Sequence, residues 1–269
     1  MISPLLRGVL LSLALVYAVL GAALFVAPVW ASEHFAWKIS PFVAMTIGGW
    51  CLGTAVTAFI IARRQSWPAM LPPILYLGLF GLFESIVVIA FRDRLLTGTP
   101  LAWLYLLSVA ATALFAVLAL AEAMRQKHIL TRLGGPLGPV GFGFALIFIL
   151  GVGFLGLYGI LAVPGMRGLN ASIFPEVLSP FSLRAFGSFY FALALAVIPI
   201  LLSRGVGNVV NHGFAMYSLL VTITAAALAY IHVFDFANRP TQAIYIGIYL
   251  LVGLVVGAYL WRYGTGASR

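Results

Sequence analysis

Charged residues divide this 269-residue chain into eight long apolar stretches. Only 8% of the residues are charged, 63% are hydrophobic, and the mean hydropathy is +1.12. Water-soluble domains usually carry about 25% charged residues, so a soluble fold could not hide this much apolar surface. A bilayer core about 30 Å thick needs about 20 apolar helical residues, which each stretch supplies. We therefore expect an all-α polytopic membrane protein. The expected spans are 7–27, 42–62, 69–91, 101–122, 140–163, 182–203, 212–233 and 241–262.

The basic residues predict how the chain is oriented. Eight spans place both termini on one side, which then carries nine Lys and Arg residues against six on the other side. Cytoplasmic loops carry the excess of positive charge, so both termini are expected in the cytoplasm, at the plasma or inner membrane. The net charge of +9 is explained by these loops, and no nucleic-acid partner is expected.

The two halves of the sequence resemble each other at an offset of 139 or 140 positions. The matched residues are Ser40-Pro41-Phe42 with Ser179-Pro180-Phe181, Gly48 with Gly187, Trp50 with Phe189, and Pro100 and Tyr105 with Pro240 and Tyr245. This offset predicts a first four-helix repeat in 1–122, a cytoplasmic linker in 123–139 and a second four-helix repeat in 140–269. Because four spans return the chain to the same side, the repeats are parallel. We expect two four-helix bundles related by a pseudo-twofold axis along the membrane normal.

Small residues and the outer loops refine this picture. Gly49 and Gly53 form a small-xxx-small pattern that lets helices approach closely. The pattern closes its own bundle, joins the two bundles or makes a dimer, and the first of these is favoured. The outer loops 28–41 and 164–181 are either short interfacial helices or irregular caps. In the first, Trp30 and Trp37 are seven residues apart and would share one face of a helix.

The four-helix unit resembles the small membrane domains of the DoxX-like group. The stretches that carry the resemblance are Phe91–Pro100 and Pro180–Gly187. In that group a first helix ends near a proline, an extracytoplasmic segment follows, and the second helix carries small residues. The first half departs from the second, because it has Ala44-Met45-Thr46 where the second has Leu183-Arg184-Ala185. Such families mostly lack a settled activity, so the resemblance implies a fold and little about mechanism.

Four polar residues are candidates for a functional role. Glu84 is the one ionisable residue well inside a predicted span, where a charge costs several kcal/mol, so it should face protein, be paired or be protonated. It is either a proton relay or cation ligand, or a glutamate that locks helices together, and the second reading is favoured. Arg184 either reaches toward Glu84 or extends to the lipid headgroups. His232 and Asp235 form either a solvated outer-face cluster or an acid–base pair.

The sequence indicates no catalytic, cofactor or metal site. It contains no HExxH, CxxC or phosphate-loop motif, and Cys51 is its single cysteine. Three functions stay open. The favoured one is a scaffold or accessory subunit of a membrane assembly, with the bilayer and either another membrane protein or a second copy as partner. The alternatives are a permease or small channel for a small or lipophilic solute that uses Glu84, and an enzyme acting on lipid-linked substrates.

Overall fold

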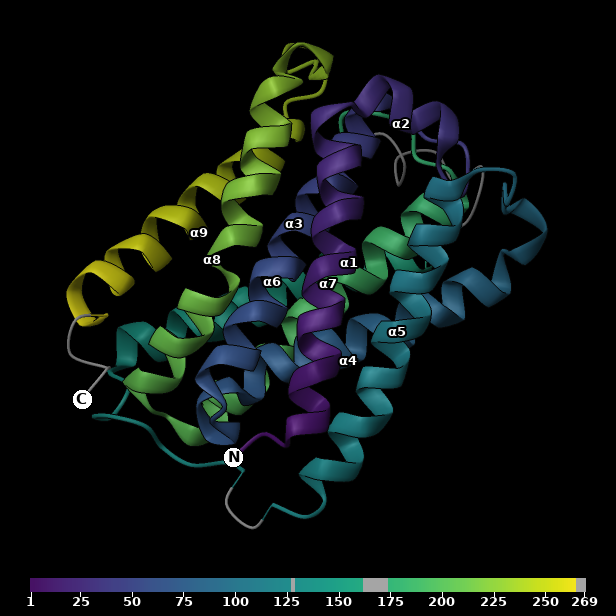
Figure 1. Cartoon of the computed structure of the whole chain (residues 1–269). Coiled ribbons are helices and arrows are strands. Elements are labelled where there is room, and N and C mark those ends of the chain that lie inside the picture. The colour runs from purple at the N-terminus through teal and green to yellow at the C-terminus, as the bar shows by residue number, and fades with distance from the viewer. Residues whose placement is uncertain (127–128, 162–173, 265–269) are drawn as a thin grey trace.

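The computed structural model describes residues 1–126, 129–161 and 174–264, and these residues are almost entirely helical (Figure 1). Eight of the described helices are long and apolar enough to cross a membrane, which confirms the predicted fold class. These helices are α1 (Pro4–Val26), α3 (Pro41–Arg64), α4 (Trp67–Ala90), α5 (Pro100–Ala123), α6 (Pro139–Leu161), α7 (Pro180–Ser203), α8 (Val206–Ala229) and α9 (Gln242–Tyr263). The short helix α2 (Pro28–His34) and the 3-10 turns η1 (Arg92–Arg94) and η2 (Ile231–Val233) lie between them.

Prolines and hydroxyl side chains set where the helices begin. Six α-helices start at a proline, which has no N–H to leave unsatisfied in the first turn. Before α3, the hydroxyl of Ser40 accepts the backbone N–H of Val43 (3.2 Å). Before α7, Ser179 accepts the N–H of Ser182 (3.1 Å) in the same way. The two Ser-Pro-Phe motifs are therefore matching helix caps.

The helices after these caps also match in position. α3 and α7 each have 24 residues, and each ends at a residue in the left-handed conformation, Gln65 (φ 54°) and Arg204 (φ 50°). α4 and α8 follow at the same spacing, and so do η1 and η2. The offset between the halves is thus 139 residues from the start of α3 to the end of η1.

Helix α8 begins six residues earlier than the sequence indicated, at Val206 instead of 212. The added segment contains the polar residues Asn208 and Asn211. In the structure the side chain of Asn208 accepts the N–H of Leu133 (2.9 Å) and donates to the carbonyl oxygen of Thr131 (3.1 Å). The linker therefore supplies the hydrogen-bond partners of Asn208, and this polar residue can lie in the first turn of α8.

Glycines mark the closest helix crossing in each half. At Gly48 in α3, a Cβ atom would lie 2.6 Å from the backbone nitrogen of Phe25 in α1. At Gly187 in α7, a Cβ atom would lie 2.5 Å from the backbone nitrogen of Ile160 in α6. Only glycine permits these backbones to approach so closely. A second glycine of each helix pair lies one turn away: Gly21 in α1 lies against Leu52, and Gly156 in α6 lies against Phe191.

The two halves are interleaved, which differs from the expected pair of separate bundles. α3 packs against α8 more closely than against α4, and α7 packs against α4 more closely than against α8. The reason is the Gly49–Gly53 pattern, whose glycines lie against Thr222 and Leu219 of α8, in the other half. The hydroxyl of Thr222 donates to the carbonyl oxygen of Gly49 (2.7 Å). This pattern therefore joins the halves, and the expectation that it closes its own bundle was wrong.

The outer segment after α1 is a short helix followed by a buried turn. α2 ends at His34, so Trp30 and Trp37 do not share a helical face. Trp30 is half exposed, whereas Trp37 is buried, stacks on Phe181 (4.2 Å between ring centroids) and donates to the hydroxyl of Ser182 (3.0 Å). Residues 164–173 of the second outer loop lie outside the described residues.

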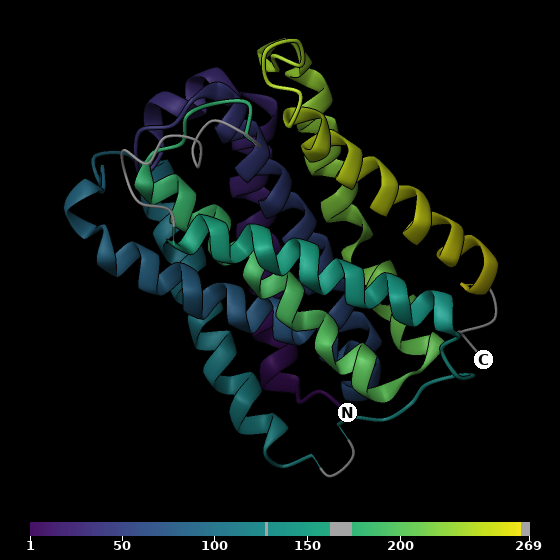
Figure 2. The ribbon, with the colours of Figure 1, turned by 180° about the vertical axis from the view of Figure 1, so that it is seen from behind.

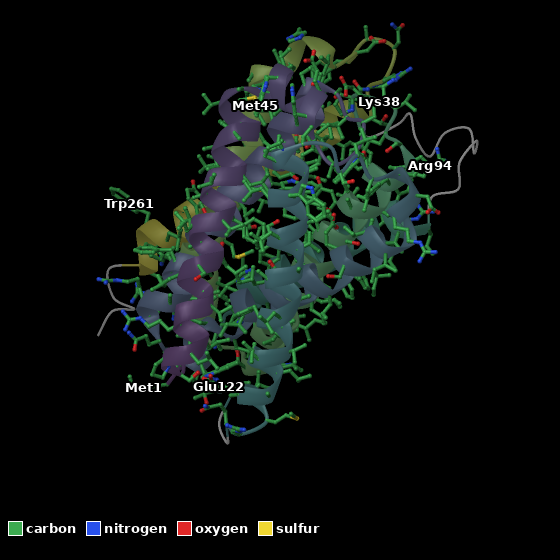
Figure 3. All side chains as sticks on the ribbon, turned by 45° about the vertical axis from the view of Figure 1, so that its right-hand side comes forward. Met1, Lys38, Met45, Arg94, Glu122 and Trp261 are labelled. Carbon is green, nitrogen blue, oxygen red and sulfur yellow. The ribbon has the colours of Figure 1, made fainter. Side chains whose placement is uncertain are left out.

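A set of hydrogen bonds around Glu122 joins three helices at one end of the helix bundle. In Figure 3, Met1 and Glu122 lie together at one end, and Lys38 and Arg94 lie toward the other. Glu122, near the end of α5, accepts the backbone N–H of Ser3 (2.9 Å), the Ser3 hydroxyl and the indole N–H of Trp67 (2.7 Å). One carboxylate thus ties together the starts of α1 and α4 and the end of α5.

Candidate functional site

Glu84 is sealed inside the protein. It lies on α4 and is 2% exposed. The hydroxyl of Tyr105, on α5, donates to its Oε1 atom (2.6 Å). Its Oε2 atom is buried and has no hydrogen-bond partner in the structure. Glu84 therefore faces protein, with one oxygen bonded and one oxygen free.

A small cavity borders this carboxyl group. Its volume is about 20 Å³. A water molecule needs about 10–15 Å³ measured in this way, so the cavity holds one water and no larger solute. The geometry thus gives no support to permeation past Glu84. The polar residues that line the cavity are Tyr17, Trp37, Trp50, Thr54, Glu84, Tyr105 and Ser108, with Cys51 beside them.

Arg184 does not approach Glu84. Its guanidinium donates to the carbonyl oxygen of Gly159 (2.8 Å), close to the end of α6. Carbonyls in the last turn of a helix have no partner within the helix, and a cation is favourable there. Arg184 therefore links the start of α7 to the end of α6, and neither predicted role describes this contact.

His232 and Asp235 do not form a pair. Asp235 accepts hydrogen bonds from the backbone N–H (3.1 Å) and the side-chain amide (3.0 and 3.1 Å) of Asn238. These bonds hold the pKa of Asp235 below its ordinary value. His232 is exposed and lies against the ring of Tyr230 (5.6 Å between centroids). Of the two alternatives for these residues, the acid–base pair is not formed, and Asp235 instead builds a surface turn.

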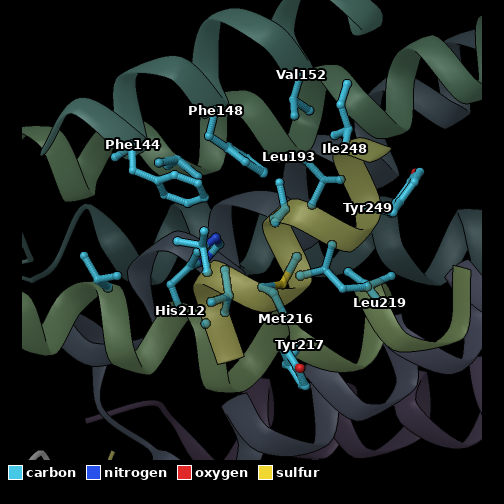
Figure 4. A pocket seen from close by; sticks show the side chains of 18 of the residues that line it. Phe144, Phe148, Val152, Leu193, His212, Met216, Tyr217, Leu219, Ile248 and Tyr249 are labelled. Atoms are coloured by element: carbon cyan, nitrogen blue, oxygen red, sulfur yellow. The ribbon is translucent and has the colours of Figure 1, made fainter. Parts of the chain in front are cut away.

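A larger cavity lies in the second half, between α6, α7, α8 and α9 (Figure 4). Its volume is about 140 Å³, and its walls are almost wholly apolar. The labelled side chains in Figure 4 come from all four helices. Representative lining residues are Phe144, Phe148, Val152, Leu193, Met216 and Ile248.

One buried polar atom in the lining of this cavity has no hydrogen-bond partner. It is Nδ1 of His212, on α8. The hydroxyl of Tyr245, on α9, instead lies beside the hydroxyl groups of Tyr190 and Tyr249, which bond to each other (2.7 Å). Because most buried polar groups in native proteins are paired, the free nitrogen of His212 suggests that a ligand completes this site.

The cavity is partly open because α6 and α9 diverge. α6 packs on α7, and α9 packs on α8, but α6 and α9 do not pack along each other. They come together near Gly141, where the hydroxyl of Tyr259 lies against the α6 backbone. From this end the two helices separate (Figure 2). The opening therefore lies between α6 and α9, on the side that a bilayer would cover.

The sequence held only weak signals for this site. His212 was not among the candidate residues, and in the structure it is the one histidine in the lining of this cavity. The tyrosines of α9 at 245 and 249 lie one helical turn apart and face the same cavity. Among the described residues no group of His, Cys, Asp and Glu is placed to hold a metal ion. The chain matches no protein-family model, no curated protein and no solved structure.

Proposed function

We propose that this protein takes up a lipophilic molecule from the bilayer into the cavity between α6, α7, α8 and α9, and acts as a binding or accessory subunit without catalysis of its own. The observation that carries the proposal is an apolar cavity, partly open between two membrane-spanning helices, with the unpartnered Nδ1 atom of His212 in its wall. A lipophilic ligand also needs no hydrophilic path, which the helices do not offer.

The size of the cavity limits the ligand. An engineered apolar cavity of about 150 Å³ binds benzene, so 140 Å³ accommodates a ring-sized group or a short chain segment. A partner helix, about 10 Å in diameter, is far too large. The occupant is therefore a small lipophile, or the end of a longer one whose remainder stays in the bilayer.

The unpartnered nitrogen of His212 requires that the ligand carry a polar atom. A neutral imidazole has one nitrogen that donates and one that accepts a hydrogen bond. A hydroxyl group on the ligand can serve either tautomer, because it both donates and accepts. A buried group left unpaired costs about 1–3 kcal/mol, which corresponds to about 5- to 150-fold in affinity. The favoured ligand class is a lipophile that carries a hydroxyl group near His212.

We infer further that the chain arose by an internal duplication. In the second half the helices leave the large cavity between them, and in the first half the corresponding helices fill this space with side chains. In the first half α1 packs on α5, where the hydroxyls of Tyr17 and Thr112 bond to each other (2.8 Å). With α1 aligned on α6 and α5 on α9, these positions become Val152 and Val252, and both line the cavity. Two valines in place of a tyrosine–threonine pair leave the space that the ligand would occupy.

The same alignment accounts for the different surroundings of Tyr245. Its counterpart Tyr105 donates to Glu84, whereas at the 139-residue offset of α4 and α8 the residue aligned with Glu84 is Ile223. The second half therefore lacks the carboxyl group that pairs this tyrosine in the first half.

We also propose that each four-helix unit is similar to the DoxX-like domains and that both termini lie in the cytoplasm.

Binding of 2-naphthol and naphthalene to the purified protein in detergent tests the proposal, because the two probes differ only in a hydroxyl group. We expect saturable binding of both, with 2-naphthol bound about 5-fold or more tightly. His212→Leu should remove this preference and keep the binding of naphthalene. Joint replacement of Val152→Tyr and Val252→Thr should abolish both.

Leu150→Tyr is the matched control for the filled cavity. Leu150 lies on α6, is 64% exposed and is not in the cavity lining, so this variant should bind as the parent protein does. Absence of saturable binding of either probe to the parent protein would contradict the proposed function. Equal binding by the filled and parent proteins would contradict the assignment of the site.

A further inference from the structure

We propose that one water molecule is bound in the first half, between the indole Nε1 of Trp50 and the Oε2 atom of Glu84. Both atoms are buried and have no hydrogen-bond partner, and both residues line the same cavity of about 20 Å³. This site is separate from the lipophile cavity, and the inference does not depend on the proposed function.

The chemistry of the two atoms suits a water molecule. An indole N–H only donates, so it needs an acceptor, and a water oxygen supplies one. Glu84 Oε2 can accept one hydrogen of that water, or donate to its oxygen when protonated. Buried waters typically make about three hydrogen bonds. Ser108 also lines the cavity, and its hydroxyl, which donates to the carbonyl oxygen of Tyr105 (2.7 Å), can still accept a bond.

The surrounding side chains hold Trp50 and Glu84 in place. The Trp50 ring is stacked on Phe189 and lies edge-on to Phe186, with centroids 4.2 and 4.3 Å away. Tyr105 fixes the other oxygen of Glu84. The neighbouring Trp37 also lines the cavity, but its indole N–H already donates to Ser182 (3.0 Å). Among the two tryptophans at the cavity, Trp50 therefore needs the water.

Infrared spectroscopy of the purified protein in H₂¹⁶O and H₂¹⁸O tests this site. A water confined between two groups should give an O–H stretching band, distinct from bulk water, that shifts with the oxygen isotope. We expect this band in the parent protein and its loss in both Trp50→Phe and Glu84→Leu. Trp37→Phe should keep the band, because it removes an indole N–H that already has a partner.

Circular dichroism identifies variants that retain the helical fold, and only those are compared. Absence of an isotope-sensitive band in the parent protein would overturn the proposal without recourse to any variant. A band that persists in folded Trp50→Phe and Glu84→Leu would also overturn it, because the water would then lie elsewhere.

Discussion

The rings of Trp50 and Phe189 stack with their centroids 4.2 Å apart and their planes 4° apart. These two residues occupy matching positions in the two halves, 139 residues apart. Phe189 also lines the large cavity, and Trp50 lines the small one beside Glu84. The stacked rings of Trp50 and Phe189 therefore lie between the two cavities, with one ring in the lining of each.

A ligand in the large cavity should change the fluorescence of Trp50. Phe189 would touch the ligand on one side and the indole on the other, so its shift or ordering alters the surroundings of the indole. Menthol is a suitable probe, because it is a ring-sized lipophilic alcohol and does not fluoresce. The emission change on adding menthol should be present in the parent protein and largely lost in Trp50→Phe. An equal change in both proteins would show that another tryptophan responds.

The glycine crossing between α6 and α7 should be intolerant of any side chain. A Cβ atom at position 187 would lie 2.5 Å from the backbone nitrogen of Ile160, so Gly187→Ala forces the helices apart. Overpacking of this kind costs about 1–3 kcal/mol and should lower the midpoint of thermal unfolding in detergent.

Gly151 provides the control for that substitution. It lies on α6, the other helix of this crossing, and a Cβ atom there would meet nothing within 4 Å. Gly151→Ala should leave stability unchanged or raise it slightly, because alanine favours the helix by about 0.8–1.0 kcal/mol relative to glycine. A similar midpoint for the two alanine variants would show that the close crossing is not required.

The lock formed by Glu122 should contribute measurably to stability. In Glu122→Leu no oxygen is left to accept the hydrogen bonds that Ser3 and Trp67 now donate. We expect a loss of about 1–3 kcal/mol in unfolding free energy. Glu33→Leu is the comparison, because Glu33 is exposed and should tolerate the change. Equal stability of the two variants would argue against the lock.

The orientation of the chain can be tested with a reporter fused to the C-terminus. The excess of Lys and Arg on the side of the termini predicts activity of a reporter that works only in the cytoplasm. Activity of a reporter that works only outside the cytoplasm would reverse the orientation and place His212 near the outer face.

The membrane spans could be predicted from the sequence, but the packing of the helices against one another could not. Apolar length and edge prolines such as Pro41 and Pro180 predicted the eight helices, because both act within one segment. The start of α8 was missed because Asn208 is satisfied by the linker, a contact between distant residues. Gly49 and Gly53 predicted a close helix contact without identifying the partner helix.

The candidate site was predicted less well than the fold. Glu84 was recognised as the one charge inside a span, but its partner Tyr105 was not, and Arg184 bonds to the carbonyl oxygen of Gly159, a contact that neither sequence-based alternative included. The large cavity arises from the divergence of α6 and α9, and a helix tilt leaves no local pattern in a sequence. The valines at 152 and 252 explain the cavity only when they are compared with Tyr17 and Thr112, and this comparison requires an alignment of the halves through the structure.

The most direct test of the account is an experimental structure of the protein in a native lipid bilayer, examined between α6 and α9. We predict an open space lined by Phe144, His212 and Tyr249, filled by non-protein density whose polar end lies within hydrogen-bond distance of His212. A structure in which α9 closes on α6 and leaves no cavity beside His212 would contradict the proposal.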